Sequence, residues 1–252
     1  MKFIKSFFMS LSMFTKIPTF NVWDEKSKKY MLLTFPFVGL IIGLIWYLIA
    51  YLLNLIHTPH IILAFALSIY SLIITGGIHF DGFMDVVDAK SSYKPLEERL
   101  KILKDSHVGA FAVIWSIVII LAHFVFFYAL KEDTNYLFLV FLPIISRIMS
   151  SLSLTTFKPL STSQYNNDGI KEHKGLRIAY LCILLAITLV VSYLFINKET
   201  FIFLGTILVH LLCTILCRIN LKGVNGDVCG YSLSIAEVLT ILVLVIGELT
   251  WM

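Results

Sequence analysis

The sequence predicts an all-α, polytopic integral membrane protein: a helical bundle of about seven transmembrane helices with an N-terminal interfacial amphipathic helix, in one membrane-embedded domain covering residues 1–252. Composition is the first reason. Hydrophobic residues make up 58% of the chain and charged residues only 14%, with a mean hydropathy of +0.88, whereas soluble domains are about one quarter charged. The other two reasons are the lengths of the apolar segments and the distribution of the basic residues.

The apolar segments give the expected number of spans, because a helix needs roughly 20 predominantly apolar residues to cross a bilayer. The second and sixth segments are short, so each could instead be re-entrant or interrupted. The seven expected spans are at about 31–55, 59–76, 109–130, 136–154, 176–196, 201–217 and 232–249.

The first twenty residues predict a helix that lies in the membrane interface and is retained. Lysines leave an apolar run too short for a leader peptide, and no small-residue cleavage site follows. At helical spacing, one face is apolar and another is polar. The apolar face comprises Phe3, Phe7, Leu11 and Phe14, and the polar face comprises Lys5, Ser12 and Lys16.

The basic residues predict the orientation, since loops on the cytoplasmic side of a membrane are enriched in Lys and Arg. The N-terminal segment and the loops 77–108, 155–175 and 218–231 are basic, whereas the connections 56–58, 131–135 and 197–200 hold at most one basic residue each. We therefore expect a protein of the prokaryotic cytoplasmic membrane with these loops in the cytoplasm. The net charge of +4 forms no dense patch, so the expected partner is the lipid bilayer and no nucleic acid.

The densest polar motif lies at 75–89. Asp81, Asp85 and Asp88 stand at positions i, i+4 and i+7, so a helix would place all three carboxylates on one face. Ionised groups beside a membrane are costly and are usually functional. A Mg²⁺ ion would relieve their repulsion, and Mg²⁺ commonly joins one or two carboxylates to substrate phosphates. The alternative is a solvated helix face beyond the membrane surface.

Two further clusters fall in the same compartment, at 104–109 and 222–230. The first holds Lys104, Asp105 and His107, and the second holds glycines that allow close backbone approach, together with Asp227. Arg147 lies inside an apolar span, where it could either pair with a buried carboxylate or contact a phosphate directly.

These motifs resemble the cobalamin synthase family of adenosylcobinamide-GDP ribazoletransferases. The segment 76–82 with Asp85 and Asp88 matches the signature G-G-x-H-x-D-G-x-x-D-x-x-D, and the segments 14–18, 104–109 and 223–227 with Glu237 extend the resemblance along nearly the whole chain. Two positions depart from the pattern. His107 stands where an Arg is expected, which removes a permanent positive charge, and Asn225 stands where Thr is usual.

The resemblance implies a transferase that joins adenosylcobinamide-GDP to α-ribazole, or to α-ribazole 5′-phosphate, and releases GMP with Mg²⁺ as cofactor. In such a reaction a metal ion and cationic side chains offset the negative charge of the diphosphate and of the leaving group. The roles that it implies are metal binding and catalysis by Asp81, Asp85 and Asp88 with Asp227 as a fourth ligand, proton acceptance by Asp105 or His79, and substrate binding by Lys104, Arg147, His107, Asn225 and Gly226.

Three other functions are compatible with an acidic motif on membrane helices. A CDP-alcohol phosphotransferase has the pattern D-G-x-x-A-R, but the Ala-Arg pair is missing after Asp81 and Gly82. A membrane prenyltransferase has two Asp-rich motifs, and Asp227 alone is a poor second one. An ion-coupled transporter carries acidic residues near mid-span. A homo-oligomer and docking with other cobalamin-assembly enzymes are both compatible with the sequence.

Overall fold

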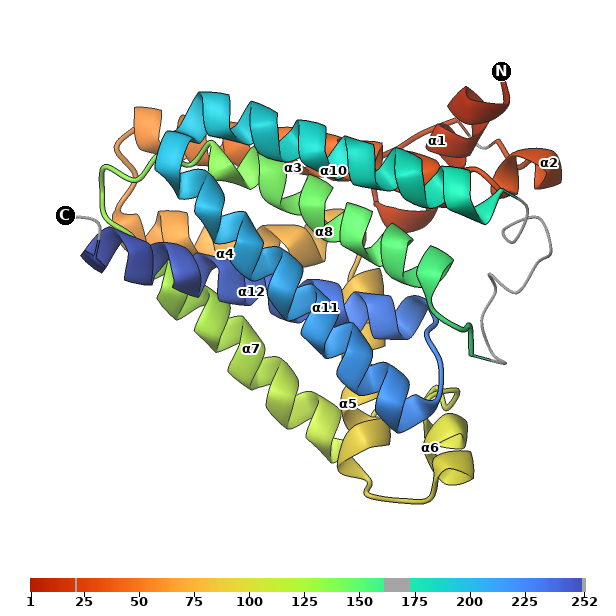
Figure 1. Cartoon of the computed structure of the whole chain (residues 1–252). Coiled ribbons are helices and arrows are strands. Elements are labelled where there is room, and N and C mark those ends of the chain that lie inside the picture. The colour runs from red at the N-terminus through yellow and green to blue at the C-terminus, as the bar shows by residue number, and fades with distance from the viewer. Residues whose placement is uncertain (21, 161–172, 251–252) are drawn as a thin grey trace.

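The computed structural model describes residues 1–20, 22–160 and 173–250, and within these ranges the chain is helical and contains no β-strand (Figure 1). The all-α prediction is therefore confirmed. The helices are α1 (Lys2–Phe14), α2 (Glu25–Lys28), α3 (Met31–Leu55), α4 (His60–Thr75), α5 (Ile78–Ser91), α6 (Leu96–Ile102), α7 (Ala110–Tyr128), α8 (Phe138–Thr156), α10 (Lys174–Ile196), α11 (Ile202–Leu221) and α12 (Gly226–Thr250), with a 3₁₀ turn at Asn197–Phe201.

Five helical stretches of the described chain are long and apolar enough to cross a membrane, and six if the bent pair α4–α5 is one span. One of these stretches, Lys174–Leu221, contains both α10 and α11. At Asn197 the backbone adopts a φ of 49°, and Figure 1 shows α11 running back antiparallel to α10. If α10 and α11 are counted as two spans and α4–α5 as one, the number of spans is the expected seven. An odd number also fits the termini, which lie at opposite ends of the bundle in Figure 1.

The second span is broken. Helices α4 and α5 meet at an angle of 92°, where the sequence predicts a loop after residue 76. Gly76 and Gly77 have φ angles of 61° and 79°, a left-handed conformation that glycine adopts without steric cost. The two glycines therefore end α4 and redirect the chain into α5, which carries the acidic motif.

Polar contacts fix α1 against the bundle. Ser6 and Ser10 are fully buried, and both hydroxyls hydrogen-bond Thr34 of α3, at 3.3 and 3.1 Å. The helix expected at the N-terminus is present. Its buried face, however, is centred on these serines with Met9 and Leu11, because the close approach of two helices favours small side chains.

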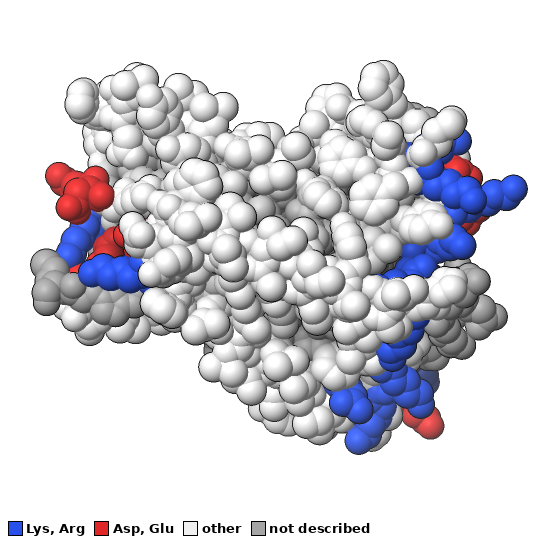
Figure 2. All heavy atoms as spheres, turned by 45° about the horizontal axis from the view of Figure 1, so that its top comes forward, with Lys and Arg blue, Asp and Glu red and all other residues white. Residues whose placement is uncertain are grey.

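Charge is concentrated at the two ends of the bundle. Figure 2 shows an uncharged belt between them, with most of the visible Lys and Arg side chains at the end where α1 and α6 lie. The short helix α6, which begins directly after Pro95, lies at this end. This distribution agrees with the asymmetry of basic residues in the sequence.

Candidate functional site

The candidate site forms where α5 crosses the start of α12. A Cβ atom added to Gly82 would lie 2.7 Å from the Cα atom of Asp227, and one added to Gly230 would lie 2.6 Å from the backbone oxygen of His79. Only glycine allows backbones this close. The two acidic segments, 145 positions apart in sequence, are therefore in direct contact.

Helix α12 begins earlier than the sequence predicts, at Gly226 rather than near 232. The side-chain oxygen of Asn225 accepts a hydrogen bond from the Val228 N–H at 3.0 Å, which is the contact that an N-cap residue makes. The Asn225 amide also donates to the Asp227 carboxylate at 2.6 Å. Asp227 therefore lies in the first turn of α12, while a Cβ at Gly226 would meet only open space.

Three carboxylates gather at this crossing. Asp81 is exposed, whereas Asp85 and Asp227 are partly buried, and Asp85 lies close enough to both of the others for their charges to repel it. Within the described residues, none of the three forms an ion pair with a basic side chain. Such uncompensated negative charge beside a membrane is unfavourable without a cation.

Asp88 makes a different contact from the other aspartates. Its two carboxylate oxygens accept hydrogen bonds from the backbone N–H groups of Gly109 at 2.6 Å and Ala112 at 2.8 Å. Asp88 thus caps the N-terminus of α7, where a negative charge also interacts favourably with the helix dipole. A carboxylate has about four acceptor positions, so this contact leaves Asp88 able to bind a cation.

The contact with Asp88 ties the loop 104–109 to α5. Lys104, Asp105 and His107 are all exposed in this loop. The His107 ring nitrogen lies 2.6 Å from the Asp105 carboxylate, and the His107 backbone N–H donates to the same oxygen. These hydrogen bonds from the His107 side chain and backbone hold the pKa of Asp105 below its usual range, which makes Asp105 a weaker base than a free aspartate.

His79, at the start of α5, and Arg147, on α8, lie in the interior of the bundle. Arg147 is fully buried and donates from Nη1 to Glu237 Oε1 at 2.8 Å. Ser146 donates to the same carboxylate oxygen at 2.7 Å. His79 stacks on the ring of Phe14, with the ring centroids 5.7 Å apart. Of the two roles expected for Arg147, the structure shows the pairing with a buried carboxylate.

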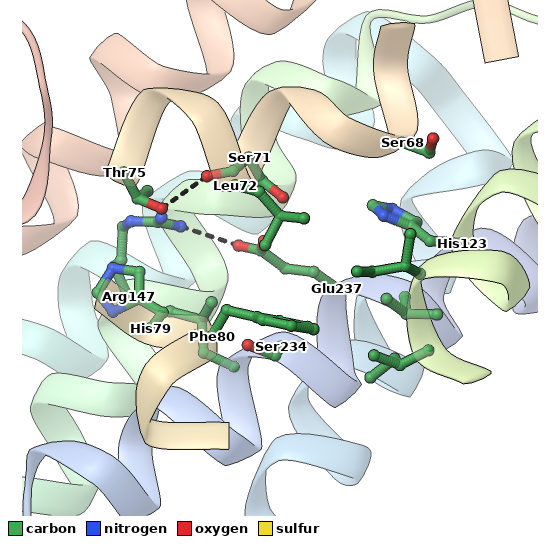
Figure 3. A pocket seen from close by; sticks show the side chains of 14 residues that line it. Ser68, Ser71, Leu72, Thr75, His79, Phe80, His123, Arg147, Ser234 and Glu237 are labelled. Atoms are coloured by element: carbon green, nitrogen blue, oxygen red, sulfur yellow. Dashed lines mark hydrogen bonds and ion pairs between the residues drawn. The ribbon is translucent and has the colours of Figure 1, made fainter. Parts of the chain in front are cut away.

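A small polar chamber adjoins this ion pair. Its volume is about 40 Å³, and it lies between α4, α5, α7, α8 and α12 (Figure 3). Arg147 Nε and Nη2 and the Nε2 atoms of His79 and His123 are buried without a hydrogen-bond partner among the described residues. A cavity of this size accommodates roughly two or three water molecules. The chamber can therefore hydrate polar groups that the protein does not pair.

Several residues at the site were not among the predicted ones. Ser68, Ser71 and Thr75 line the chamber, and their spacing along one apolar helix is a sequence signal for a polar face inside the membrane. Away from the site, on the face of α5 opposite the aspartates, Lys90 donates to the Tyr231 hydroxyl at 3.1 Å. It gave no such sequence signal, because a lysine near a span end is common.

A metal site at the crossing would be incomplete as the side chains stand. In the part of the chain that the structure describes, no three His, Cys, Asp or Glu side chains are close enough together to enclose a metal ion. The donors fit Mg²⁺ in type, since they are hard carboxylate oxygens, and Mg²⁺ usually takes only one or two protein carboxylates together with waters and substrate phosphates.

Known proteins give a consistent match to this chain. The family model for cobalamin-5-phosphate synthase matches residues 6–245. A relative from Clostridium perfringens (strain SM101 / Type A), an adenosylcobinamide-GDP ribazoletransferase, is 36% identical over 251 residues, covering 96% of this chain and 98% of the relative. A relative of the same name from Clostridium botulinum (strain Alaska E43 / Type E3) is 38% identical over 243 residues, covering 93% and 94%.

A third relative with this name, from Lachnoclostridium phytofermentans, is 33% identical and covers 98% of this chain and 96% of its own length. No solved structure matches the chain significantly. These matches confirm the family resemblance carried by the acidic motif. They therefore rule out the CDP-alcohol phosphotransferase, prenyltransferase and transporter alternatives. The chain belongs to the cobalamin-5-phosphate synthase family and is a transferase of cobalamin synthesis.

Proposed function

We propose that the protein joins adenosylcobinamide-GDP to α-ribazole, or to α-ribazole 5′-phosphate. The 5′-hydroxyl oxygen of the ribazole forms a bond to the phosphorus next to the corrinoid arm. The bond from that phosphorus to the bridging oxygen breaks, GMP leaves with the bridging oxygen, and the hydroxyl proton passes to a base. The corrinoid product is adenosylcobalamin or its phosphate. The names of the relatives support these two substrates.

The observation that carries the proposal is the contact of α5 with α12, which brings Asp227 beside Asp81 and Asp85. Their carboxylates, with Asp88, would hold Mg²⁺ against the diphosphate. When bound, the ion would withdraw charge from the phosphoryl oxygens and stabilise the leaving GMP.

Asn225 keeps Asp227 in place, because it caps α12 and donates to the Asp227 carboxylate. Asp88 keeps the loop 104–109 at the end of α5. Lys104 is exposed on that loop, so its ammonium group is available to a phosphate of the substrate. Productive transfer needs nucleophile and diphosphate held together within a few ångströms.

The proton acceptor is proposed to be Asp105 rather than His79. Asp105 is exposed at the loop, where a substrate hydroxyl can reach it, whereas His79 Nε2 is buried in the interior. The hydrogen bonds from His107 orient the Asp105 carboxylate. They also lower its basicity, so the benefit of His107 to catalysis is that it orients the base and not that it strengthens it.

The site is proposed to face the cytoplasm. The loops that carry it lie at the end of the bundle where Figure 2 shows most of the Lys and Arg side chains, and such loops stay on the cytoplasmic side.

The direct test is an assay of purified membranes with adenosylcobinamide-GDP, α-ribazole and Mg²⁺, followed by mass analysis of the corrinoid and the nucleotide. We expect adenosylcobalamin and one GMP per turnover. The matched variants are Asp227→Asn at the site and Asp133→Asn in the connection at the opposite end of the bundle. Release of GDP instead of GMP, or equal loss of activity in both variants, would contradict the proposal.

A further inference from the structure

The face of α5 opposite the aspartates borders a second cavity. At about 100° per residue, Phe83, Val87 and Lys90 point roughly opposite to Asp81 and Asp85. These three residues line a cavity of about 380 Å³ between α5, α7 and α12. Except for Lys90, Ser91 and the Tyr231 hydroxyl, its lining is apolar.

A basic pocket of about 390 Å³ adjoins this apolar cavity, and the two share Lys90 and Ser91. The basic pocket is also lined by Lys94 and Arg99. Glu98 lies 3.3 Å from the Lys94 ammonium group and offsets one of these three positive charges. Arg99 Nε is buried and has no partner among the described residues.

Lys90 is held at the junction of the two cavities. Its ammonium nitrogen lies 4.8 Å from the centre of the Tyr231 ring and donates to the Tyr231 hydroxyl. An ammonium group has three N–H donors, so two remain for a ligand. A molecule that fits both cavities must have an apolar part beside an anionic group.

We infer that these joined cavities bind an anionic phospholipid of the membrane, with an acyl chain in the apolar cavity and the headgroup phosphate among Lys90, Lys94 and Arg99. The source is the bilayer because the apolar cavity is walled by α7, and only 22% of the residues in the membrane-spanning stretch of this helix are buried. Trp115 of α7 lines the cavity and is itself 51% exposed. Basic residues at a membrane surface attract anionic lipids.

The test measures lipid retained by the purified full-length protein, using native mass spectrometry after reconstitution in phosphatidylglycerol or in phosphatidylcholine. We expect wild type to retain one phosphatidylglycerol and at least about tenfold less phosphatidylcholine, a difference of about 1.4 kcal/mol. Lys90→Gln with Arg99→Gln should lose this preference. Lys101→Gln is the control. Lys101 is an exposed residue of α6, the helix that carries Arg99, and it lines neither cavity, so this variant should keep the preference.

A second variant tests the apolar half without changing charge. Ala122→Trp fills the cavity between α5, α7 and α12, and it should abolish retention while the basic pocket stays intact. Equal retention of the two lipids by wild type would overturn the inference, as would full retention by Ala122→Trp. Displacement of the retained lipid by free inorganic phosphate at millimolar concentration would also overturn it, because a headgroup alone would then account for binding.

Discussion

Gly82 of α5 touches the backbone of Asp227 in α12, since a Cβ atom at Gly82 would lie 2.7 Å from the Asp227 Cα atom and 3.0 Å from its carbonyl oxygen. No flexible side chain separates the two helices at this point. The position of Asp227 relative to the acidic face of α5 therefore depends directly on the absence of a side chain at residue 82.

Gly82→Ala should push α5 and α12 apart. Overpacking of this kind costs about 1–3 kcal/mol, and the shift should also move Asp227 away from Asp81, so both the melting temperature and the turnover should fall. Gly175→Ala is the matched control, because a Cβ there meets no atom within 4 Å. It should leave turnover unchanged and should not lower the melting temperature, and a Gly82→Ala variant with normal activity would contradict the close contact.

Asp88 and Asp81 should respond differently to the same substitution. Asp88→Asn keeps one acceptor for the Gly109 and Ala112 N–H groups and loses the other, so it should cost about 1–2 kcal/mol of stability. Asp81→Asn removes an exposed charge that repels Asp85, so thermal stability should be unchanged or higher.

Turnover should nevertheless fall in Asp81→Asn, by about a hundredfold or more if the carboxylate holds a catalytic cation. Thermal melts in detergent and the corrinoid assay separate the two effects. Loss of stability in Asp81→Asn without loss of turnover at low temperature would exclude a role in metal binding.

The buried pair of Arg147 and Glu237 should be more important for stability than for chemistry. Glu237→Gln leaves the guanidinium uncompensated in an apolar interior, which costs about 3–5 kcal/mol. Replacing both residues, as Arg147→Met with Glu237→Leu, should recover much of that loss. A double variant that folds and still turns over would exclude a direct phosphate contact by Arg147. A folded but inactive one would support such a contact.

Most of the architecture could be predicted from the sequence, because a helix that crosses lipid must be apolar over roughly 20 residues. The span at 31–55 coincides with α3, and the others differ from their helices by a few residues at most, except the last. Hydropathy could not locate the start of α12, because Asn225, Gly226 and Asp227 are polar and look like a loop. The cap formed by Asn225 makes them the first turn of a helix.

The parts of the candidate site were predictable from the sequence, but the individual contacts between its helices were not. Spacing alone places Asp81, Asp85 and Asp88 on one helix face. Which residues meet across helices depends on packing, so the contact of Gly82 with Asp227 and the capping of α7 by Asp88 could not be read from spacing. The distinct position of Asp88 among the three aspartates follows only from that capping contact.

The predicted topology can be tested at two exposed positions in a background without native cysteines. Lys101→Cys lies on α6 and Glu132→Cys lies in the connection between α7 and α8. A membrane-impermeant thiol reagent added to intact cells should label Glu132→Cys and should reach Lys101→Cys only after lysis. Labelling of both from outside would contradict this topology, because the loop that carries α6 and the segment 104–109 would then not face the cytoplasm.

The shared metal site of α5 and α12 is tested most directly by the equilibrium binding of Mn²⁺, followed by electron paramagnetic resonance with adenosylcobinamide-GDP present. Wild type should bind one ion at the crossing, and Asp133→Asn should bind it equally well. Asp81→Asn and Asp227→Asn should each weaken binding by at least about tenfold, an effect seen even for groups behind metal ligands. Undiminished Mn²⁺ binding by folded Asp227→Asn would contradict a metal site built from both helices.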